Sequence, residues 1–409
     1  MLKNSFISVT AIALLLSLSF CGNQAQEQTK DDKSTKSNQN KEEKTSKKPS
    51  DIKIERKFND LARFIAGMQP EEGSVYEELS KRKEWVNYAK NADKQWNDVI
   101  NIKRPKLIKW RETELEKITK QGGTLFYPFS GPDFLHAGTF FPEVDNIVMI
   151  GLEPIGTLPD IDKIAKTNLG GYFNGLQRSL VTILQYSFFK TIDMNVDLTG
   201  RVVSSIDGTL PVIMLFMART NHKILNYEKM ALNKEGELVA ITDFKAEKNT
   251  YYATKIEFQR GDKPEERKTL YYLSVNLSND IYEGKGGLNQ RKDLKTFIEK
   301  LDFKTVYLKS ASYLMYKPYF SVIKNIILDK TKYLVQDDSG MAFNNFTNGK
   351  WDVTLFGTYA GPISLFANYW QNDMNTAYKQ KKYTIRPLPF GIGYQFREGS
   401  SNLIMVEKK

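Results

Sequence analysis

Residues 124–154 read TLFYPFSGPDFLHAGTFFPEVDNIVMIGLEP, and the order of apolar runs and turn residues in this stretch decides the fold class. The run Thr124–Phe129 predicts a buried strand, and Asn146–Ile150 predicts a second one. Between them, residues 130–133 form a turn that opens a short helix over Phe134–Phe140. A strand, a turn, a helix and a second strand in this order are typical of a parallel α/β unit.

The segments downstream of this unit predict a larger sheet with helices around it. Predicted helices lie at residues 167–189, 210–218, 291–301 and 319–328, and predicted strands at 305–309, 333–335, 352–357, 391–396 and 403–406. Between 222 and about 277 the apolar period becomes that of strands separated by turns. The predicted fold class is therefore α/β: a mixed, mainly parallel sheet with flanking helices over 121–409, with an antiparallel meander inserted at about 222–277.

The segment 51–120 differs from the rest, because its apolar residues recur at helical spacing. Phe58, Leu61 and Ile65 mark a first helix, and Pro105 suits the first turn of a third one. Charged residues fall largely between the apolar stripes. We therefore expect an N-terminal cap of amphipathic helices.

The N-terminus carries a predicted export signal that ends at Cys21, the only cysteine of the chain. Lys3 precedes the apolar run Ile7–Phe20, which is shorter than the roughly 20 residues that span a bilayer. This pattern is typical of a bacterial lipoprotein signal, in which residues 1–20 are removed and Cys21 receives the lipid. Phe20 departs from the pattern, because a small residue usually precedes the cysteine. Ordinary secretion and an uncleaved signal anchor are the alternatives.

Residues 21–50 are predicted to be a disordered, lipidated linker. From Gly22 to about Ser50 the chain has no aromatic or large aliphatic residue, so apolar burial cannot offset the entropy of ordering. Lys30-Asp31-Asp32 is similar to charged signals that send some lipoproteins to the cell surface, although a solvated tail is the simpler interpretation. We expect the protein in the bacterial cell envelope, anchored in the bilayer through Cys21, at the outer membrane.

Composition limits the partners and the chemistry. The 409 residues carry 59 Lys and Arg against 48 Asp and Glu, a net charge of +11, but the two signs are interleaved. No basic block contains the aromatic or glycine residues of a nucleic-acid module, so nucleic acid is not expected as a partner. The absence of cysteine after Cys21 excludes a disulfide framework, a thiolate catalyst and a cysteine-ligated zinc.

Candidate site residues follow from the rule that ligands bind beyond the carboxyl ends of parallel strands. Each predicted strand of the parallel part is followed by carboxylates or hydroxyls. The resulting candidate ligand rim comprises Ser130, Asp133, Glu153, Ser312, Asp337 and Asp338. If the strands are parallel neighbours, these side chains gather at one edge of the sheet.

Several sharper interpretations of these residues stay open. Gly131 after the first strand and Glu153 after the second match the layout of mononucleotide-binding folds, which class I methyltransferases share, but Pro132 removes a backbone donor. Asp337 and Asp338 would suit a hard cation or acid–base chemistry, whereas capping of a following helix is the simpler interpretation. We expect neither a resident cofactor nor a metal site.

Two further hypotheses concern hydrolysis and sugar binding. Ser130, His136 and an acid resemble a hydrolase relay, but Ser130 lacks the Gly-x-Ser-x-Gly elbow that exposes a nucleophile. His136 in a short helix is more often a structural hydrogen-bonding group. The aromatic residues between Tyr313 and Tyr378, with neighbouring Asn and Asp, are of the kind that bind glycans, although most aromatic residues in such a domain belong to the core.

Several segments resemble an uncharacterised family of bacterial envelope lipoproteins. They are YPFSGPDF (127–134), GLEP (151–154), KSASYL (309–314), QDDSG (336–340) and PLPF (387–390). The resemblance covers most of the chain after the linker. It implies the anchor and the compartment, and no activity.

The sequence therefore predicts a membrane-anchored lipoprotein with a ligand-binding or assembly role in the envelope, with an envelope protein or a glycan as partner. The alternative is an envelope enzyme, hydrolytic or metal-assisted, that uses the carboxylates at the strand ends. The leading hypothesis is the non-enzymatic one.

Overall fold

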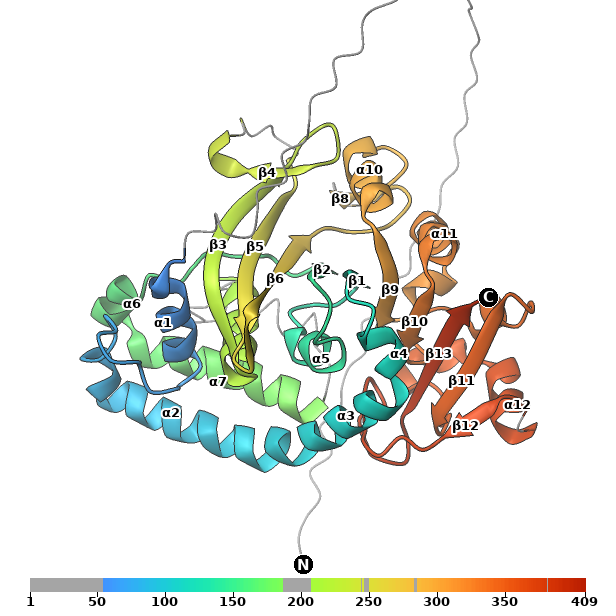
Figure 1. The fold of residues 1–409 in the computed structure, drawn as a ribbon, viewed down its shortest axis with the longest axis horizontal. Coiled ribbons are helices and arrows are strands. Elements are labelled where there is room, and N and C mark those ends of the chain that lie inside the picture. The colour runs from blue at the N-terminus through green and yellow to red at the C-terminus, as the bar shows by residue number, and fades with distance from the viewer. Residues whose placement is uncertain (1–53, 187–206, 244, 246–249, 283–284, 381) are drawn as a thin grey trace, which may run out of the picture. The chain divides into compact units, whose positions relative to one another are not determined.

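An 11-stranded mixed sheet runs through the folded part of the chain (Figure 1). The computed structural model describes residues 54–186, 207–243, 245, 250–282, 285–380 and 382–409. These residues belong to one compact unit that begins at Pro49. Cys21, the signal segment, the linker and Lys30-Asp31-Asp32 lie outside the described residues.

The sheet has the strand order β12-β11-β13-β10-β9-β1-β2-β6-β5-β3-β4. The strands are β1 (Thr124–Pro128), β2 (Asn146–Gly151), β3 (His222–Leu232), β4 (Leu238–Ala240), β5 (Tyr252–Arg260), β6 (Lys263–Ser274), β9 (Phe303–Leu308), β10 (Tyr333–Gln336), β11 (Trp351–Gly357), β12 (Thr384–Arg386) and β13 (Asn402–Lys408). A separate hairpin pairs β7 (Ile281–Tyr282) with β8 (Lys285–Gly286).

The central strands β10, β9, β1, β2 and β6 are all parallel to their neighbours in this group. From β1 the chain passes to β2, then to β3 and β4 at the far edge, and back through β5 to β6; it continues later to β9 on the other side of β1. The strand order therefore reverses between β1 and β9, which is the topological switch point of a doubly wound sheet. Antiparallel strands flank this centre on both sides. The predicted α/β class with a mixed, mainly parallel sheet is confirmed.

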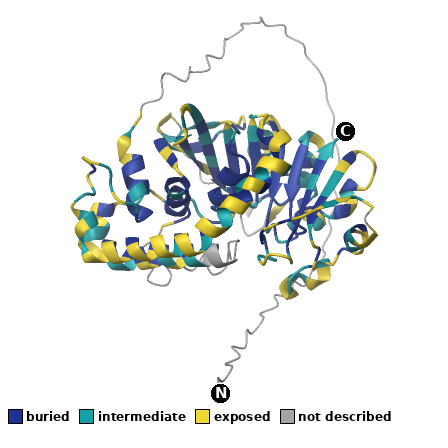
Figure 2. Cartoon of the chain, turned by 60° about the horizontal axis from the view of Figure 1, so that its bottom comes forward, coloured by how far each residue is buried: buried dark blue, intermediate teal, exposed yellow. Residues whose placement is uncertain are grey.

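Helices cover both faces of the sheet. They are α1 (Arg56–Ile65), α2 (Lys83–Gln95), α3 (Asn101–Glu114), α4 (Glu116–Thr119), α5 (Phe134–Phe140), α6 (Ile161–Thr167), α7 (Leu169–Tyr186), α9 (Leu210–Arg219), α10 (Lys292–Lys300), α11 (Ser321–Lys330) and α12 (Asn372–Gln380). Figure 2 shows their outer faces exposed and the strands behind them largely buried. No helix among the described residues is long and apolar enough to cross a bilayer.

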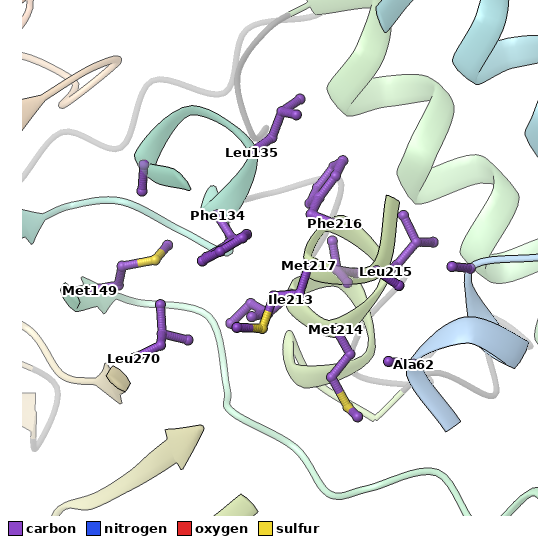
Figure 3. Packing of buried hydrophobic residues seen from close by; sticks show 14 of the residues in the cluster. Ala62, Phe134, Leu135, Met149, Ile213, Met214, Leu215, Phe216, Met217 and Leu270 are labelled. Atoms are coloured by element: carbon purple, nitrogen blue, oxygen red, sulfur yellow. The ribbon is translucent and has the colours of Figure 1, made fainter. Parts of the chain in front are cut away.

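Two hydrophobic cores result from the alternation of side chains along the strands. Leu125 and Tyr127 of β1 enter the first core, which includes residues of α1, α2, α3, α5, α7 and α9. Phe126 enters the second core, with residues of α10, α11 and α12. Figure 3 shows Phe134 of α5 and Met149 of β2 beside Ile213 and Met217 of α9 in the first core.

The predicted helical region is present, but its third helix does not begin at Pro105. Helix α2 continues through a π-helical turn, η3 (Trp96–Ile100), into α3, so Pro105 lies inside a helix. Pro105 has no N–H group, so the carbonyl of Asn101, four residues earlier, lacks its usual helical hydrogen bond. Asn101 is the first residue after the π-helical turn. The missing hydrogen bond therefore lies at the junction of the π-helical turn and α3, and the helix continues past it.

One predicted strand needs correction. Residues 391–396 form a tight loop, because the chain folds back until a Cβ on Gly391 would lie 1.8 Å from the carbonyl oxygen of Phe396. The predicted antiparallel meander is present as β3, β4, β5 and β6, and its last strand β6 also pairs in parallel with β2. The meander is therefore continuous with the central sheet.

Candidate functional site

The six candidate residues lie at the carboxyl ends of four neighbouring strands, β2, β1, β9 and β10. The sequence prediction therefore placed them correctly at one edge of the sheet. Only Ser312 is partly exposed; the other five are at most 4% exposed, namely Ser130, Asp133, Glu153, Asp337 and Asp338. These five side chains lie inside the protein at this edge of the sheet, and their hydrogen bonds determine their roles.

Asp133 is the centre of a buried ionic cluster at the switch point. Its Oδ2 lies 2.6 Å from Lys309 Nζ and accepts a hydrogen bond from Tyr127 Oη at 2.9 Å. Its Oδ1 caps α5 by accepting from the His136 backbone N–H at 3.2 Å. Burial alone would raise the pKa of Asp133, but His136 and Lys309 outweigh burial and hold it below its usual value. We call Tyr127, Asp133, His136 and Lys309 the switch-point cluster.

The imidazole of His136 is held between the two charges of this cluster. Its Nδ1 lies 2.9 Å from Asp133 Oδ1 and 3.2 Å from Lys309 Nζ. Burial lowers the pKa of His136 to about 4, with Lys309 contributing to the shift and Asp133 opposing it. The ring is therefore neutral at pH 7, and its Nδ1 serves either as donor to Asp133 or as acceptor from Lys309. The cluster carries one buried positive and one buried negative charge.

Asp337 and Asp338 point in different directions and do not form a paired carboxylate site. Asp337 accepts from the backbone N–H groups of Ser310 and Ser339, at 2.9 and 3.0 Å. Asp338 accepts from Tyr313 Oη at 2.6 Å. Burial raises the pKa of both carboxyls, and the neighbouring Asp338 raises that of Asp337 further. Capping of a following helix was a wrong interpretation, because Asp337 instead ties the loop after β10 to the loop after β9.

Left-handed backbone conformations concentrate on the same edge. Of the five described non-glycine residues with positive φ, four lie in the loops after β1 and β9: Phe129, Ser310, Ser312 and Tyr313, with φ between 53° and 59°. Such conformations are unfavourable for side-chain-bearing residues and persist only where surrounding contacts hold them. The Ser312 hydroxyl lies 2.7 Å from Tyr394 Oη, and the Tyr313 ring stacks on Tyr369 at 4.9 Å. The loop after β9 is therefore fixed by distant parts of the chain.

The mononucleotide hypothesis does not fit this geometry. The Ser130 N–H, which would have to face a phosphate, donates to the Ile150 carbonyl at 2.8 Å, and Pro132 has no N–H. A Cβ on Gly151 would lie 3.2 Å from the Gly131 Cα, so the loop after β1 packs directly against the end of β2. This contact fills the place where a phosphate cradle would open.

The hydrolase and metal hypotheses are likewise unsupported by the described residues. The Ser130 hydroxyl donates to the carbonyls of Gly131 and Ile150, while the His136 ring contacts Asp133 and Lys309. The Ser130–His136 relay is therefore not formed. Within the part of the chain that the structure describes, no three His, Cys, Asp or Glu side chains converge in a way that could hold a metal ion.

Many of the aromatic residues considered for glycan binding pack on one another. Tyr316 and Phe366 each contact the Tyr313 ring, with centroids 5.4 and 5.2 Å apart, and Phe366 contacts Tyr394. This cluster closes over the loop that holds Asp338. Trp370 remains 46% exposed, with its indole N–H bonded to Asn372.

A cavity of about 440 Å³ opens at the carboxyl ends of β2 and β6. Its walls come from the loop after β2, from β3 and β5 and from the segment before β5: Pro154, Ile155, Gly156, Tyr227, Lys229, Ile241, Thr250, Tyr251, Tyr252, Ala253, Thr254 and Ser274. Glu153 lies directly before the first of these residues and is bonded through its carbonyl to Tyr272 Oη. The cavity thus adjoins the predicted edge, but none of its lining residues was among the predicted site residues.

A larger hollow of about 920 Å³ lies beside the opposite, amino-terminal edge, near Gly122 and Asp145. Its lining alternates acidic and basic side chains, several of which are already joined in ion pairs. Glu143 contacts both Arg260 and Lys263, at 2.5 and 2.7 Å. Arg267, which also lines it, has a buried Nη1 without a hydrogen-bond partner among the described residues.

No protein-family model, curated protein or solved structure matches the chain.

Proposed function

We propose that this protein is a lipid-anchored binding protein of the bacterial envelope, held at the outer membrane through Cys21. The lipoprotein-like signal and the segments that resemble envelope lipoproteins support the anchor and the compartment. The folded part supplies the binding function, with a small ligand or an envelope partner as its target.

One observation carries the binding role: the 440 Å³ cavity lies at the carboxyl ends of β2 and β6. Parallel sheets bind ligands at this edge, and cavities of roughly 300–1,000 Å³ are typical of small-molecule sites. The loops after β1, β9 and β10, further along the same edge, are tied to one another by the switch-point cluster and the Asp337 contacts. A cavity that is already open in the free protein suits binding without a large ordering penalty.

The enzyme alternative has weaker support. A general acid or base must reach the substrate with its carboxyl or imidazole group. Asp133, Asp337 and Asp338 are instead buried and bonded to their own loops. Their geometry supports a role in fixing the loops after β1, β9 and β10.

The binding function predicts a stabilising ligand for the cavity. A panel of divalent cations, nucleotides, sugars, peptidoglycan fragments and amphiphiles is screened by thermal shift on the chain from residue 22 onward, without the lipid. A ligand at a hundredfold excess over its Kd should stabilise the fold by about 2.7 kcal/mol. Ser274→Trp, which fills the cavity mouth, should abolish the shift, whereas the exposed control Ser364→Trp should retain it. A shift that survives Ser274→Trp would place the ligand elsewhere.

The anchor has its own test in a bacterial host. The full chain should sediment with membranes and incorporate labelled palmitate, while Cys21→Ser should do neither. Ser19→Ala, which leaves the thiol in place, is the matched control and should behave like the parent. Release of the parent chain into the soluble fraction would overturn the anchored assignment.

A further inference from the structure

We propose that the cavity binds a single-chain amphiphile with an anionic headgroup, of the free-fatty-acid class. This inference rests on the proposed binding function and names its ligand. Three independent features carry it: the chemistry of the walls, the polar groups at one side, and the position of the cavity relative to the entry of the anchored chain.

The walls of the cavity are mainly apolar and aromatic. Ile155, Ile241 and Pro154 line one part, and the rings of Tyr227, Tyr251 and Tyr252 line another. The lining contains no carboxylate and no carboxamide among the described residues. Sugar sites need planar polar groups that bond pairs of hydroxyls, and cation sites need carboxylates; neither is present in this lining. An extended hydrocarbon chain, by contrast, matches such walls.

The polar groups at the cavity are an ammonium and hydroxyls. Lys229 on β3 and Thr254 on β5 stand directly opposite each other in the antiparallel register, so their side chains share one face. Lys229 is exposed and has no ion pair with a described residue, whereas Thr254 is fully buried. The buried hydroxyls of Tyr227 and Thr254 interact with each other, and neither has another hydrogen-bond partner among the described groups.

Buried hydroxyls without a full set of partners are unfavourable, and a ligand oxygen that accepts from them removes the deficit. Lys229 supplies a positive charge beside these hydroxyls, and this charge favours a ligand whose accepting group is an anion. The site thus combines donors, one cation and no nearby acidic lining residue. A carboxylate at this side, with its chain along the tyrosine and isoleucine walls, satisfies both parts of the cavity.

The cavity also lies beside the point where the N-terminal chain joins the fold. The Glu55 N–H donates to the Leu225 carbonyl at 2.8 Å, and Phe58 of α1 contacts the Tyr227 ring with centroids 5.7 Å apart. Exposed apolar side chains occur at this region: Leu152 in the loop after β2 and Tyr252 on the wall are 47% and 41% exposed. A chain anchored through Cys21 enters the domain here. A ligand derived from membrane lipids is therefore the class that we expect at this position.

The test measures binding of dodecanoate, below its micelle concentration, to the unlipidated chain by titration calorimetry. Monododecanoyl glycerol carries the same chain on a neutral headgroup, and butyrate carries the carboxylate on a short chain. Dodecanoate should bind, and both comparison compounds should bind at least tenfold more weakly. Lys229→Gln should weaken dodecanoate binding about tenfold. Lys223→Gln, a control exposed on the same strand, should leave it unchanged.

The outcomes separate this inference from the binding function beneath it. Equal affinity for dodecanoate and its glycerol ester, or dodecanoate binding that survives Ser274→Trp, would overturn the anionic-amphiphile assignment. If another compound class gives a shift that Ser274→Trp abolishes while dodecanoate is silent, the inference falls and the binding function stands. If no compound in the panel binds, both fall.

Discussion

Lys309→Met is expected to lower the free energy of unfolding by about 3–5 kcal/mol, because it leaves the buried carboxylate of Asp133 without its compensating charge. Asp133 is fully buried, and Lys309 Nζ lies 2.6 Å from it. The remaining donors, Tyr127 and the His136 backbone, do not carry a positive charge at pH 7. The carboxyl must then be protonated or the loop after β1 must open, and either process destabilises the fold.

Urea unfolding at pH 7 measures this change. Lys304→Met is the control, since Lys304 is an exposed lysine of the same strand β9, and it should change the free energy by less than about 0.5 kcal/mol. The double variant Asp133→Asn/Lys309→Met removes both charges and should be more stable than Lys309→Met alone. A single variant as stable as the parent would mean that Lys309 does not neutralise Asp133 in solution.

Acidification from pH 7 to pH 4 is expected to remove several kcal/mol of stabilisation that two buried histidines contribute, because both must stay neutral in the fold. Burial lowers the pKa of His136 to about 4 and that of His222 to about 3. Lys309 adds to the shift at His136, and Arg104 and Arg260 add to that at His222. A lowered folded pKa means that the unfolded chain binds more protons, so this stability is present above about pH 6.5 and lost below it.

Asp337 contributes with the opposite sign. Its raised pKa means that the folded state holds a proton more tightly, so its contribution is present at low pH and lost as the pH rises through the folded value. This term opposes the histidine terms between pH 4 and 7. Asp133, with a lowered pKa, adds a loss of stability only at more acidic pH. Asp338, whose pKa burial also raises, acts in the same direction as Asp337, so the histidine contribution is isolated by comparing the parent with a histidine variant.

Urea unfolding at pH 7, 6, 5 and 4 tests this dependence. His222→Gln should be less stable than the parent at pH 7, because it loses ring contacts to Phe134 and Phe258. Its free energy of unfolding should, however, fall less steeply with acid. Parallel curves for the parent and this variant would show that His222 titrates normally in the fold.

The sequence of residues 124–154 predicted β1, α5 and β2 correctly, because the apolar runs and the turn residues in this stretch indicate the same elements. The strand runs are apolar on both faces, as both faces of the sheet are covered by a core. Asp133 was also correctly placed before a helix, since a carboxylate at this position caps the first turn. These features depend on residues that are close to one another in the sequence, so they can be predicted from the sequence of one chain.

The partners of the candidate residues could not be predicted in the same way. Lys309 pairs with Asp133 only because β9 adds to β1, and Tyr394 reaches Ser312 from a loop near the end of the chain. Ser130 was expected at an open rim, yet its hydroxyl is used on neighbouring carbonyls. The cavity was missed because its walls combine a loop, two antiparallel strands and a turn, none of which carries a motif.

The position of β13 in the sheet limits the order in which the strands can pair during folding. Strand β13 lies between β10 and β11, and it is antiparallel to both. Until Asn402–Lys408 have been synthesised, β11 and β12 have no strand that links them to the centre, and the edge of β10 stays open. The ion pair between Lys117 of α4 and Glu407 likewise requires the last strand. We therefore expect β11 and β12 to join the central sheet only after β13 has been synthesised.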